Sequence, residues 1–471
     1  MSSRVKIEDI CTKICSGGTP KSGVAEYYED GKIPWLNTGE INFNRIRRTN
    51  SYITEAGLTS SSAKWISKNS ISIAMYGATA GKAAVVKIPF TTNQACCNLE
   101  VNENAADYRF VYYWLQYNYS KLANLANGGA QQNLSAKTIK ALEIDLPPMP
   151  VQRSVAEVLS RLDDKVELNN CLNDYLEELF SLLYQRLIEE NNCTYTPLTD
   201  VIFFQEGPGI RNWQYVYDGQ GVNFINIRCI RQEHDFDLSN ANQISKEEAY
   251  GKYKHFLVEP GDILMSSSGT LGRYAIARSE NLPLCMNTSV IRFRPLKDPG
   301  AYAFVYGYLT SQEFYSHLTN MSTGSAQVNF GPTHLKKIEV PLPSNEAIHA
   351  FNRQAQPIID CMVAMHSENG RLAKLRDTLL PKLMSGEIDV SKVDVTQLNN
   401  HLSLRAIEMS NLNDLLVFEV PVLLREKVET KRKVHSISIR LIDCVLLNPD
   451  AFRHPSDTAP SYSSWQAKSG A

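Results

Sequence analysis

The stretch GGAQQNLSAKTIKALEIDLPP at residues 128–148 decides how this chain is organised, because GSAQVNFGPTHLKKIEVPLPS at residues 324–344 repeats its pattern. Between Ala130 and Pro147, seven residues of the first stretch recur 196 positions later. The matching pairs run from Ala130 and Ala326 to Pro147 and Pro343. A duplicated unit is therefore the first hypothesis to consider, because overlooking a repeat leads to a wrong assignment of the whole fold.

The similarity between the two halves continues upstream with small changes of offset. YRFVYYWL from Tyr108 corresponds to YAFVYGYL from Tyr302, and WLN from Trp35 corresponds to FIN from Phe224. A period of this length is too long for a solenoid and makes each copy the size of a domain. We therefore expect two homologous globular halves and a further segment after them.

Each half begins with short segments rich in β-branched and aromatic residues, such as NSISIAM and VIRFRPL, which predict strands joined by turns. Short helices are expected at residues 108–119 and 302–318. After Pro147 and Pro343 the apolar residues are spaced at steps of three and four, which predicts two long helices. The residues predicted to form the core of a helix pair are Val155, Leu159, Leu162, Val166, Leu172, Leu176, Leu179, Leu183, Leu187, Phe351, Ile358, Met362, Leu372, Leu375, Leu379 and Leu383.

The apolar stripes of these helices are too narrow for burial in a large core, which favours packing of the two helices against each other. The alternative is that each helix packs on its own β-rich domain. Asn169 and Asn170 break the first stripe, and Pro357 predicts a kink or a late start in the second helix.

The predicted fold class is α+β, with two homologous mixed α/β domains separated by two long helices that pack as a pseudo-twofold antiparallel coiled coil. The predicted segments are a first domain at residues 1–145, a central helix at 146–195, a second domain at 196–340, a C-terminal helix at 341–395 and an extension at 396–471.

Charge and composition limit the class of protein. The net charge of −2 argues against a generic basic coat for nucleic acid. The predicted segments carry +4, −5, −1, −1 and +1 in chain order, so a polyanion would meet the β-rich domains rather than the acidic central helix. The ten cysteines form no CxxC pair and no zinc pattern, which is typical of reduced thiols. Without a signal peptide or an apolar run long enough to span a bilayer, we expect a soluble, cytoplasmic protein with no membrane contact.

The sequence contains no recognisable catalytic motif. GATAGK at residues 77–82 lacks the spacing of a Walker loop, so we expect a glycine-bearing turn there and in SGTLGR at residues 268–273. Asp163 and Asp164 point about 100° apart on a helix, cannot share one site and are expected to face solvent. A structural role is expected for His334 and His366. We therefore predict no catalytic residue, metal or cofactor in this chain.

Several motifs now make a family recognisable. LPPMPVQRSVAEVLSRLDDKVELNN from Leu146 and LRDTLLPKLMSGEIDV from Leu375 resemble the central and C-terminal repeat regions of type I restriction-modification specificity subunits. SGGTPK from Ser16, GDILMSSSGTLGRYAIA from Gly261 and QQNLS from Gln131 are similar to motifs of that family's target recognition domains. The resemblance covers about residues 5–395.

The resemblance implies a non-catalytic, DNA-reading subunit. Each domain would read one half of a bipartite, asymmetric site on double-stranded DNA, while the helices set the gap and dock modification (methyltransferase) subunits. Restriction (endonuclease/translocase) subunits would join through these, and S-adenosylmethionine, ATP and Mg would be bound by the partner subunits.

Candidate DNA contacts follow from side-chain chemistry. Amides read adenine, Arg reads guanine, and Lys, Arg, Ser and Thr hold phosphates. Gln131 and Gln327 belong to a motif that both domains share, so a turn-bracing role is as compatible with them as base contact. Arg45, Arg47 and Arg48 are not repeated and are better candidates for specificity. The candidates are Thr19, Lys21, Asn37, Arg45, Arg47, Arg48, Tyr76, Thr79, Lys82, Gln131 and Gln132 in the first domain and Arg211, Asn226, Arg228, Arg231, Ser268, Thr270, Arg273 and Gln327 in the second.

Residues 396–471 depart from the family pattern and repeat nothing upstream; their polar composition favours disorder or weak packing. Two other function classes stay open at this point. One is a DNA methyltransferase or nuclease with its own activity, against which the missing motifs argue. The other is a protein scaffold that binds no DNA, which the near-neutral charge favours.

Overall fold

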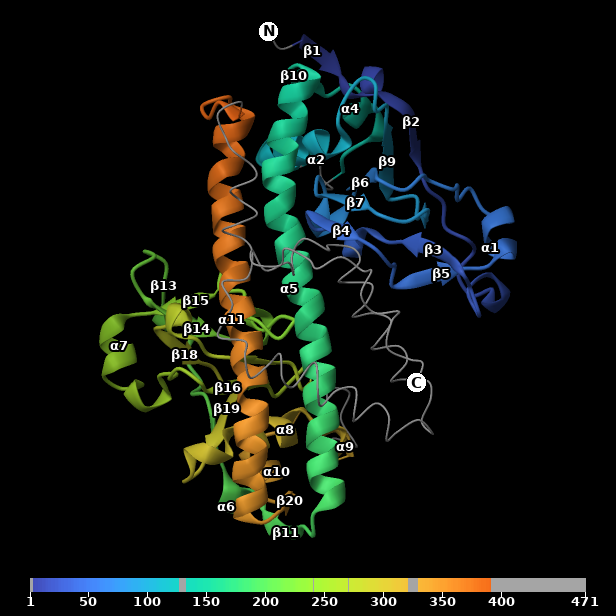
Figure 1. Ribbon diagram of the computed structural model, residues 1–471. Helices are drawn as coiled ribbons and strands as arrows, with labels where there is room; N and C mark the ends of the chain where they lie inside the picture. Colours follow the sequence, from blue (N-terminus) through green and yellow to red (C-terminus); the bar gives the residue numbers. More distant parts are fainter. Residues whose placement is uncertain (1–2, 127–132, 240, 270, 321–328, 391–471) are drawn as a thin grey trace, which may run out of the picture. The chain divides into compact units, whose positions relative to one another are not determined.

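A computed structural model gives the fold of residues 3–126, 133–239, 241–269, 271–320 and 329–390 (Figure 1). The chain forms two compact units. Of the described residues, unit 1 contains those within 3–165 and 372–390, and unit 2 contains those within 166–371. Each unit thus combines one β-rich part with parts of both long helices. We call the β-rich part of unit 1 (residues 3–146) head 1 and that of unit 2 (residues 194–342) head 2.

Head 1 contains a five-stranded sheet of order β2-β9-β6-β7-β4, a three-stranded sheet of order β5-β3-β8 and the antiparallel pair β1-β10, which joins the two ends of the head. Its elements are β1 (Ser3–Lys6), β2 (Cys11–Ser16), β3 (Ile33–Leu36), β4 (Asn44–Ile46), β5 (Ser51–Ile53), α1 (Glu55–Thr59), β6 (Ser70–Ala74), β7 (Ala83–Val86), β8 (Thr91–Thr92), β9 (Cys96–Val101), α2 (Tyr108–Tyr117), α3 (Tyr119–Ala126), α4 (Ala136–Lys140) and β10 (Glu143–Leu146).

Head 2 contains two four-stranded sheets, of order β12-β19-β16-β17 and β13-β15-β14-β18, and the antiparallel pair β11-β20. Its elements are β11 (Thr194–Pro197), α6 (Leu198–Val201), β12 (Ile202–Glu206), β13 (Tyr215–Val216), β14 (Val222–Ile225), β15 (Asn242–Ile244), α7 (Lys246–Tyr250), β16 (Ile263–Ser266), β17 (Tyr274–Ile276), β18 (Leu284–Met286), β19 (Val290–Pro295), α8 (Tyr302–Thr310), α9 (Gln312–Asn320), α10 (Pro332–Leu335) and β20 (Glu339–Leu342).

The strand order is the same in both heads. The run β2-β9-β6-β7 corresponds to β12-β19-β16-β17, and β5-β3-β8 corresponds to β15-β14-β18. The orders β5-β3-β8 and β15-β14-β18 each contain one parallel pair, β3 with β8 and β14 with β18. Head 1 adds β4 to one sheet and head 2 adds β13 to the other. The fold therefore repeats as the sequence repeats.

The two long helices are continuous. α5 runs from Met149 to Glu190, through Asn169 and Asn170, and α11 runs from Asn345 to Met384. Pro357 lies inside α11, so of the two expected outcomes, a kink or a late start, the late start is wrong. A proline inside a helix costs about 3 kcal/mol. Burial of the neighbouring Ala355 and Ile358 in the core of unit 2 offsets that cost.

In unit 2, both helices share one apolar core with head 2. Phe180 of α5 lies 5.7 Å from Phe351 of α11 and 4.9 Å from Tyr306 of α8, measured between ring centroids. Gly307 of α8 lets Tyr184 of α5 approach, because a Cβ at this glycine would lie 2.3 Å from that ring. In this unit the two helices thus contact each other and head 2.

In unit 1, α5 and α11 also meet head 1 in a common core. Val155 and Leu159 of α5 and Leu380 and Leu383 of α11 belong to the same buried cluster as the residues of head 1. Most of the residues predicted for the helix-pair core are therefore buried against a head as well as against a helix.

Leu375 is the clear exception among the predicted core residues, because it is 43% exposed. Arg376 takes the inward position instead and donates to Asp163 of α5 at 2.9 Å. Four further residues of the predicted core are only partly buried: Val166, Leu172, Leu179 and Leu379.

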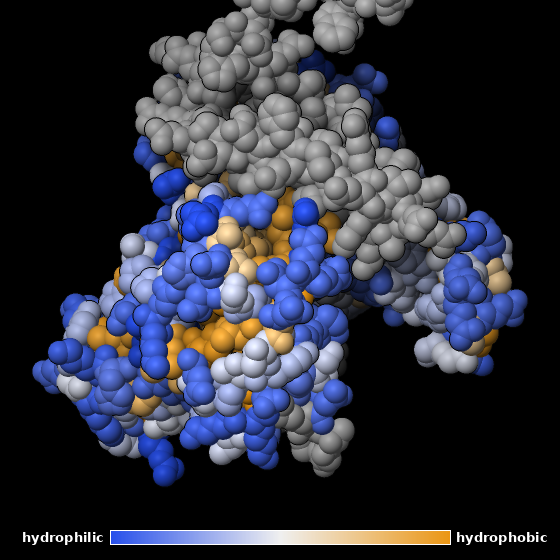
Figure 2. Space-filling model, turned by 60° about the horizontal axis from the view of Figure 1, so that its bottom comes forward, coloured by the Kyte–Doolittle hydropathy of each residue, from blue (hydrophilic) through white to orange (hydrophobic). Residues whose placement is uncertain are grey.

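Figure 2 turns the lower end of Figure 1, where parts of unit 2 lie, toward the viewer. Hydrophobic residues gather there in a hollow that hydrophilic residues surround. Hydrophobic residues thus reach this face of the molecule in a limited area between hydrophilic ones.

Candidate nucleic-acid interface

The turn between β6 and β7 forms an exposed edge of head 1. Gly77 and Gly81 have φ angles of 76° and 83°, which favour glycine and explain the glycine-bearing turn. Tyr76 precedes the turn, is 43% exposed and forms a bridge with Asn133. Leu134 N donates to Met75 O at 2.8 Å. The segment that begins at Asn133, after the repeated pair Ala130 and Gln131, therefore returns to the end of β6.

Head 2 repeats this arrangement at the turn between β16 and β17. Ser268 forms a bridge with Asn329, and Phe330 N donates to Ser267 O at 3.0 Å. Gly269 and Gly272 of this turn also have positive φ angles, 69° and 75°. Asn329 follows Asn133 by 196 positions. The same pair of loops thus meets at the same strand end in both heads.

A pair of asparagines extends each edge. In head 1, Asn93 Nδ2 donates to Asn37 Oδ1 at 3.2 Å, and Asn93 N donates to Leu36 O at 3.1 Å. In head 2, Asn287 N donates to Ile225 O at 3.0 Å, directly before Asn226. Sequence reasoning missed Asn93 and Asn287. Their offset of 194 positions, which equals that of Tyr108 and Tyr302, is the signal that would have found them.

The remaining polar candidates of head 1 connect to this edge. Thr79 Oγ1 donates to Thr38 O at 3.1 Å, and Lys82 Nζ donates to Asn42 Oδ1 at 2.7 Å. Thr19 bonds to Gln94, the residue after Asn93. The structure therefore brings together Thr19, Asn37, Tyr76, Thr79 and Lys82, while Lys21 is exposed on the adjoining loop. We call this set the head 1 edge.

Arg45 does not belong to the head 1 edge, which corrects one prediction. Its side chain is only 8% exposed and lies between β4 and α5. It forms ion pairs with Asp163 and Asp164 and donates to Tyr113 Oη at 3.3 Å. An arginine held in this way is not available to DNA phosphates. Asp163, in turn, is not the solvent-facing residue that we expected, because Tyr113 also donates to it at 2.6 Å.

The other arginines differ in exposure. Arg47 and Arg48 are exposed in head 1, and Arg211 and Arg228 are exposed in head 2. Arg231 is exposed but forms an ion pair with Asp237 at 3.0 Å. Asn226, Ser268 and Arg273 are partly buried at or beside the turn of head 2. Gln131, Gln132, Thr270 and Gln327 lie outside the described residues.

Two aromatic residues of head 2 were missed by sequence reasoning. Trp213 is 80% exposed and Tyr217 is 84% exposed, on the segment that also carries Arg211. Exposed aromatic rings beside a cation can stack on nucleic-acid bases. Their place in a stretch rich in Gly, Asn and Asp was the available signal, because such stretches form exposed turns.

The histidines named in the sequence make local contacts. His334 Nδ1 accepts from Gly331 N at 3.2 Å, and His366 Nε2 lies 3.3 Å from Asn173 Nδ2. Within the residues that the structure describes, no group of His, Cys, Asp and Glu side chains could hold a metal ion. In that same part of the chain, no helix has the length and apolar character needed to cross a bilayer.

Comparison with known proteins identifies the family. Residues 2–178 and 197–364 each match the type I restriction modification DNA specificity domain. The MjaIX specificity subunit of Methanocaldococcus jannaschii is 22% identical over 82% of this chain and 94% of that protein. The EcoBI specificity subunit of Escherichia coli is 25% identical over 64% of this chain and 70% of that protein. A crystal structure of the S subunit from M. genitalium covers 81% of this chain and 96% of that chain, with 17% identity and a TM-score of 0.49. The two matches to one domain confirm the predicted repeat, and the chain belongs to the family of type I restriction-modification specificity subunits, which recognise DNA and are not themselves catalytic.

Proposed function

We propose that this chain reads an asymmetric, bipartite site on double-stranded DNA, one half with each head. The observation that carries this proposal is the repeated edge, in which the bridges Tyr76–Asn133 and Ser268–Asn329 join the same two loops in two copies of one specificity domain. The side chains gathered there are amides, hydroxyls and cations, which are the groups that contact bases and phosphates. Because the exposed residues of the two edges differ, the two half-sites differ.

The two long helices set the gap between the half-sites. α5 contains 42 residues, which corresponds to about 63 Å at 1.5 Å per residue. This length is sufficient to carry two heads that read half-sites about one DNA turn, roughly 34 Å, apart.

Contacts in unit 2 support an antiparallel coiled coil with a pseudo-twofold axis. Asn369 Nδ2 donates to Asn170 Oδ1 at 2.8 Å, and Asn173 Nδ2 lies 3.3 Å from His366 Nε2. The 196 positions that separate the two repeats also separate Asn173 from Asn369 and Asn170 from His366. The two contacts are therefore equivalent under an exchange of the repeats, which supports an axis between residues 171 and 172 of α5.

The specificity subunit acts within a larger assembly. Modification (methyltransferase) subunits dock on the helices and heads, and restriction (endonuclease/translocase) subunits join through them. S-adenosylmethionine, ATP and Mg belong to these partner subunits. The chain itself supplies the sequence information and the spacing.

Methylome sequencing of cells that express this chain with its modification subunits tests the proposal. We expect methylated adenines in one asymmetric motif with two specified parts and a gap of fixed length. Exchange of residues 5–145 for the same segment of a relative should change one part of the motif and leave the other part and the gap unchanged. A contiguous motif, or an exchange that changes both parts, would overturn the proposal. Methyl transfer by the isolated chain would refute its non-catalytic role.

A further inference from the structure

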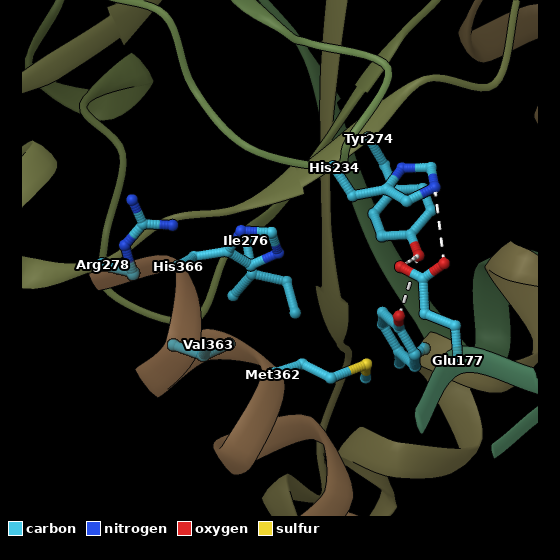
Figure 3. A pocket seen from close by; sticks show the side chains of 9 residues that line it. Glu177, His234, Tyr274, Ile276, Arg278, Met362, Val363 and His366 are labelled. Atoms are coloured by element: carbon cyan, nitrogen blue, oxygen red, sulfur yellow. Dashed lines mark hydrogen bonds and ion pairs between the residues drawn. The ribbon is translucent and has the colours of Figure 1, made fainter. Parts of the chain in front are cut away.

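A loop of head 2 reaches both long helices with two neighbouring side chains. The loop consists of residues 231–237, and we call it the bridging loop. His234 Nε2 lies 3.7 Å from Glu177 Oε2 of α5 (Figure 3). Asp235 Oδ2 lies 3.8 Å from Nδ1 of His366 of α11. Consecutive residues thus contact different helices.

The base of the bridging loop is fixed to head 2. Arg231 N donates to Asp235 O at 2.8 Å, and Asp237 N donates to Cys229 O at 2.8 Å. Phe236 is buried in one cluster with Cys229. His234 has a φ angle of 57°, which a residue other than glycine adopts only where its surroundings hold it. The tip therefore moves with head 2 and not independently of it.

On the side of α5, the bridging loop enters a buried aromatic site (Figure 3). The ring of His234 stacks on Tyr274, with 4.0 Å between the centroids and 13° between the planes. Tyr274 Oη donates to Glu177 Oε1 at 3.2 Å and lies 2.8 Å from Tyr306 Oη. Desolvation lowers the pKa of His234 to about 4, so the ring is neutral at neutral pH. His234 therefore acts by stacking on Tyr274, whose hydroxyl binds α5, rather than by an ion pair with Glu177.

On the side of α11, the bridging loop enters a charged network. Arg278 is 8% exposed and donates to Asp235 at 2.7 Å and to Glu280 at 2.8 Å. Ser367 of α11 donates to Glu280. His366, beside Ser367, also contacts Asn173 of α5, so this network connects head 2 with both helices.

These polar contacts are directional, unlike the apolar contacts of head 2 with the helices. Apolar burial has no preferred direction and tolerates small displacements. Hydrogen bonds hold only within a narrow range of distance and angle, and those that join head 2 to the helices run from Tyr274 to Glu177 at 3.2 Å and from Ser367 to Glu280. His234 stacks on Tyr274, and Asp235 pairs with Arg278, which also holds Glu280, so two consecutive residues of the bridging loop position both of these hydrogen bonds.

We infer that His234 and Asp235 are positioning residues that fix the place of head 2 on α5 and α11, and thereby the place of the second half-site relative to the helices. This inference rests on the function proposed above. It implies that a foreign head grafted in place of head 2 must carry a bridging loop that matches Glu177 and His366.

Methylation assays with the complex of the full chain and its modification subunits test this inference. The substrates are DNA duplexes in which the two half-sites are separated by the native gap or by gaps one or two base pairs shorter or longer. For His234→Ala and for Asp235→Ala, we expect the ratio of methylation rates at the native and neighbouring gaps to fall at least threefold. The half-site sequences should not change, because the head edges are untouched.

Two matched variants make the test specific. Gln232→Ala changes an exposed residue at the tip of the same loop and should keep the native ratio. Asp235→Asn keeps the side-chain volume and a partner for Arg278 and should retain most of the gap preference. If the alanine variants fail to assemble, His234→Gln, which removes the ring stacked on Tyr274, decides by the same ratio.

The outcomes separate this inference from the proposed function. Folded His234 and Asp235 variants with an unchanged gap ratio would overturn the positioning role. A wild-type complex that shows no gap preference would instead refute the function proposed for the helices. A uniform loss of rate at all gaps, with the ratio preserved, would assign these residues to stability alone and would also overturn the inference.

Discussion

Lengthening both long helices by one turn should lengthen the gap in the recognised DNA. The variant carries four added residues after Cys171 of α5 and four after Ser367 of α11, positions that are 196 residues apart. These sites flank the contacts Asn369–Asn170 and Asn173–His366, so equivalent residues stay paired on both sides of the insertions. Coiled coils absorb a four-residue insertion by local unwinding.

The size of the effect follows from the helical rise. Four residues add about 6 Å at 1.5 Å per residue. One base pair adds about 3.4 Å and turns the second half-site by roughly 36°, as a DNA turn of about 34 Å and 10 base pairs implies. The added length of about 6 Å is close to the rise of two base pairs. The rotation of the second half-site by roughly 36° per base pair instead favours the addition of only one. The preferred gap should therefore grow by one or two base pairs.

Methylome sequencing of cells that contain this variant and wild-type modification subunits measures the gap directly. The two half-site sequences should stay the same. As a control, four residues inserted at Glu103, in an exposed turn of head 1 between β9 and α2, should leave the gap unchanged. A soluble, assembled and active variant with the native gap would show that the helices do not set the spacing.

Three further predictions concern single residues. Desolvation raises the pKa of Glu177 from 4.5 to about 7, so the stability that this group contributes below about pH 4.5 is lost as the pH rises through 7. Glu177→Gln should remove up to about 3 kcal/mol of that loss, which is measured as the change of Tm between pH 5 and pH 8. Phe180→Ala should lower the free energy of unfolding by about 3–5 kcal/mol, whereas the exposed Leu375→Ala should change it by less than about 0.5 kcal/mol, as measured by denaturant titration. Arg47→Ala with Arg48→Ala should reduce the log–log salt slope of DNA binding by up to about one per lost phosphate contact, whereas Arg45→Ala should lower Tm without changing that slope.

The duplication and the long helices could be predicted because each rests on a pattern within the sequence. A common offset of 196 residues relates the repeats, and steps of three and four residues mark the helices. The burial of Arg45 could not be predicted in this way. Its partner Asp164 is 119 residues away, on a helix whose pattern says nothing about β4. Side-chain pairing between distant elements has no periodic signal.

The choice between Leu375 and Arg376 shows the same limit on a smaller scale. Hydrophobicity places the leucine inside and the arginine outside. The structure reverses this order because Asp163 offers Arg376 a buried carboxylate at 2.9 Å. Asn93 and Asn287 were missed for a different reason. Their offset was present in the sequence, but amides in a turn are common and carry no signal until the fold places them beside Asn37 and Asn226.

The two heads share a strand order but not their polar contacts with the helices, and this difference restricts how heads can be exchanged. In unit 1, Asp163 of α5 accepts from Arg376 and pairs with Arg45 of head 1. Ile359 lies 196 positions after Asp163, and Phe180 lies 196 positions before Arg376. Both residues are buried in the apolar core of unit 2.

A copy of head 1 placed at the position of head 2 would therefore bring Arg45 against Ile359 and Asp360, the equivalents of Asp163 and Asp164, so Arg45 would lose one carboxylate partner and keep the other. A buried arginine that loses its partner costs about 3–5 kcal/mol, so the loss of one of two partners should cost less than this. Such a chimaera should melt below the wild-type chain. The added substitution Ile359→Asp should recover part of the loss, because it restores a carboxylate at that place. If the chimaera were as stable as the wild type, or if Ile359→Asp lowered its Tm further, the polar contacts would not decide where each head fits.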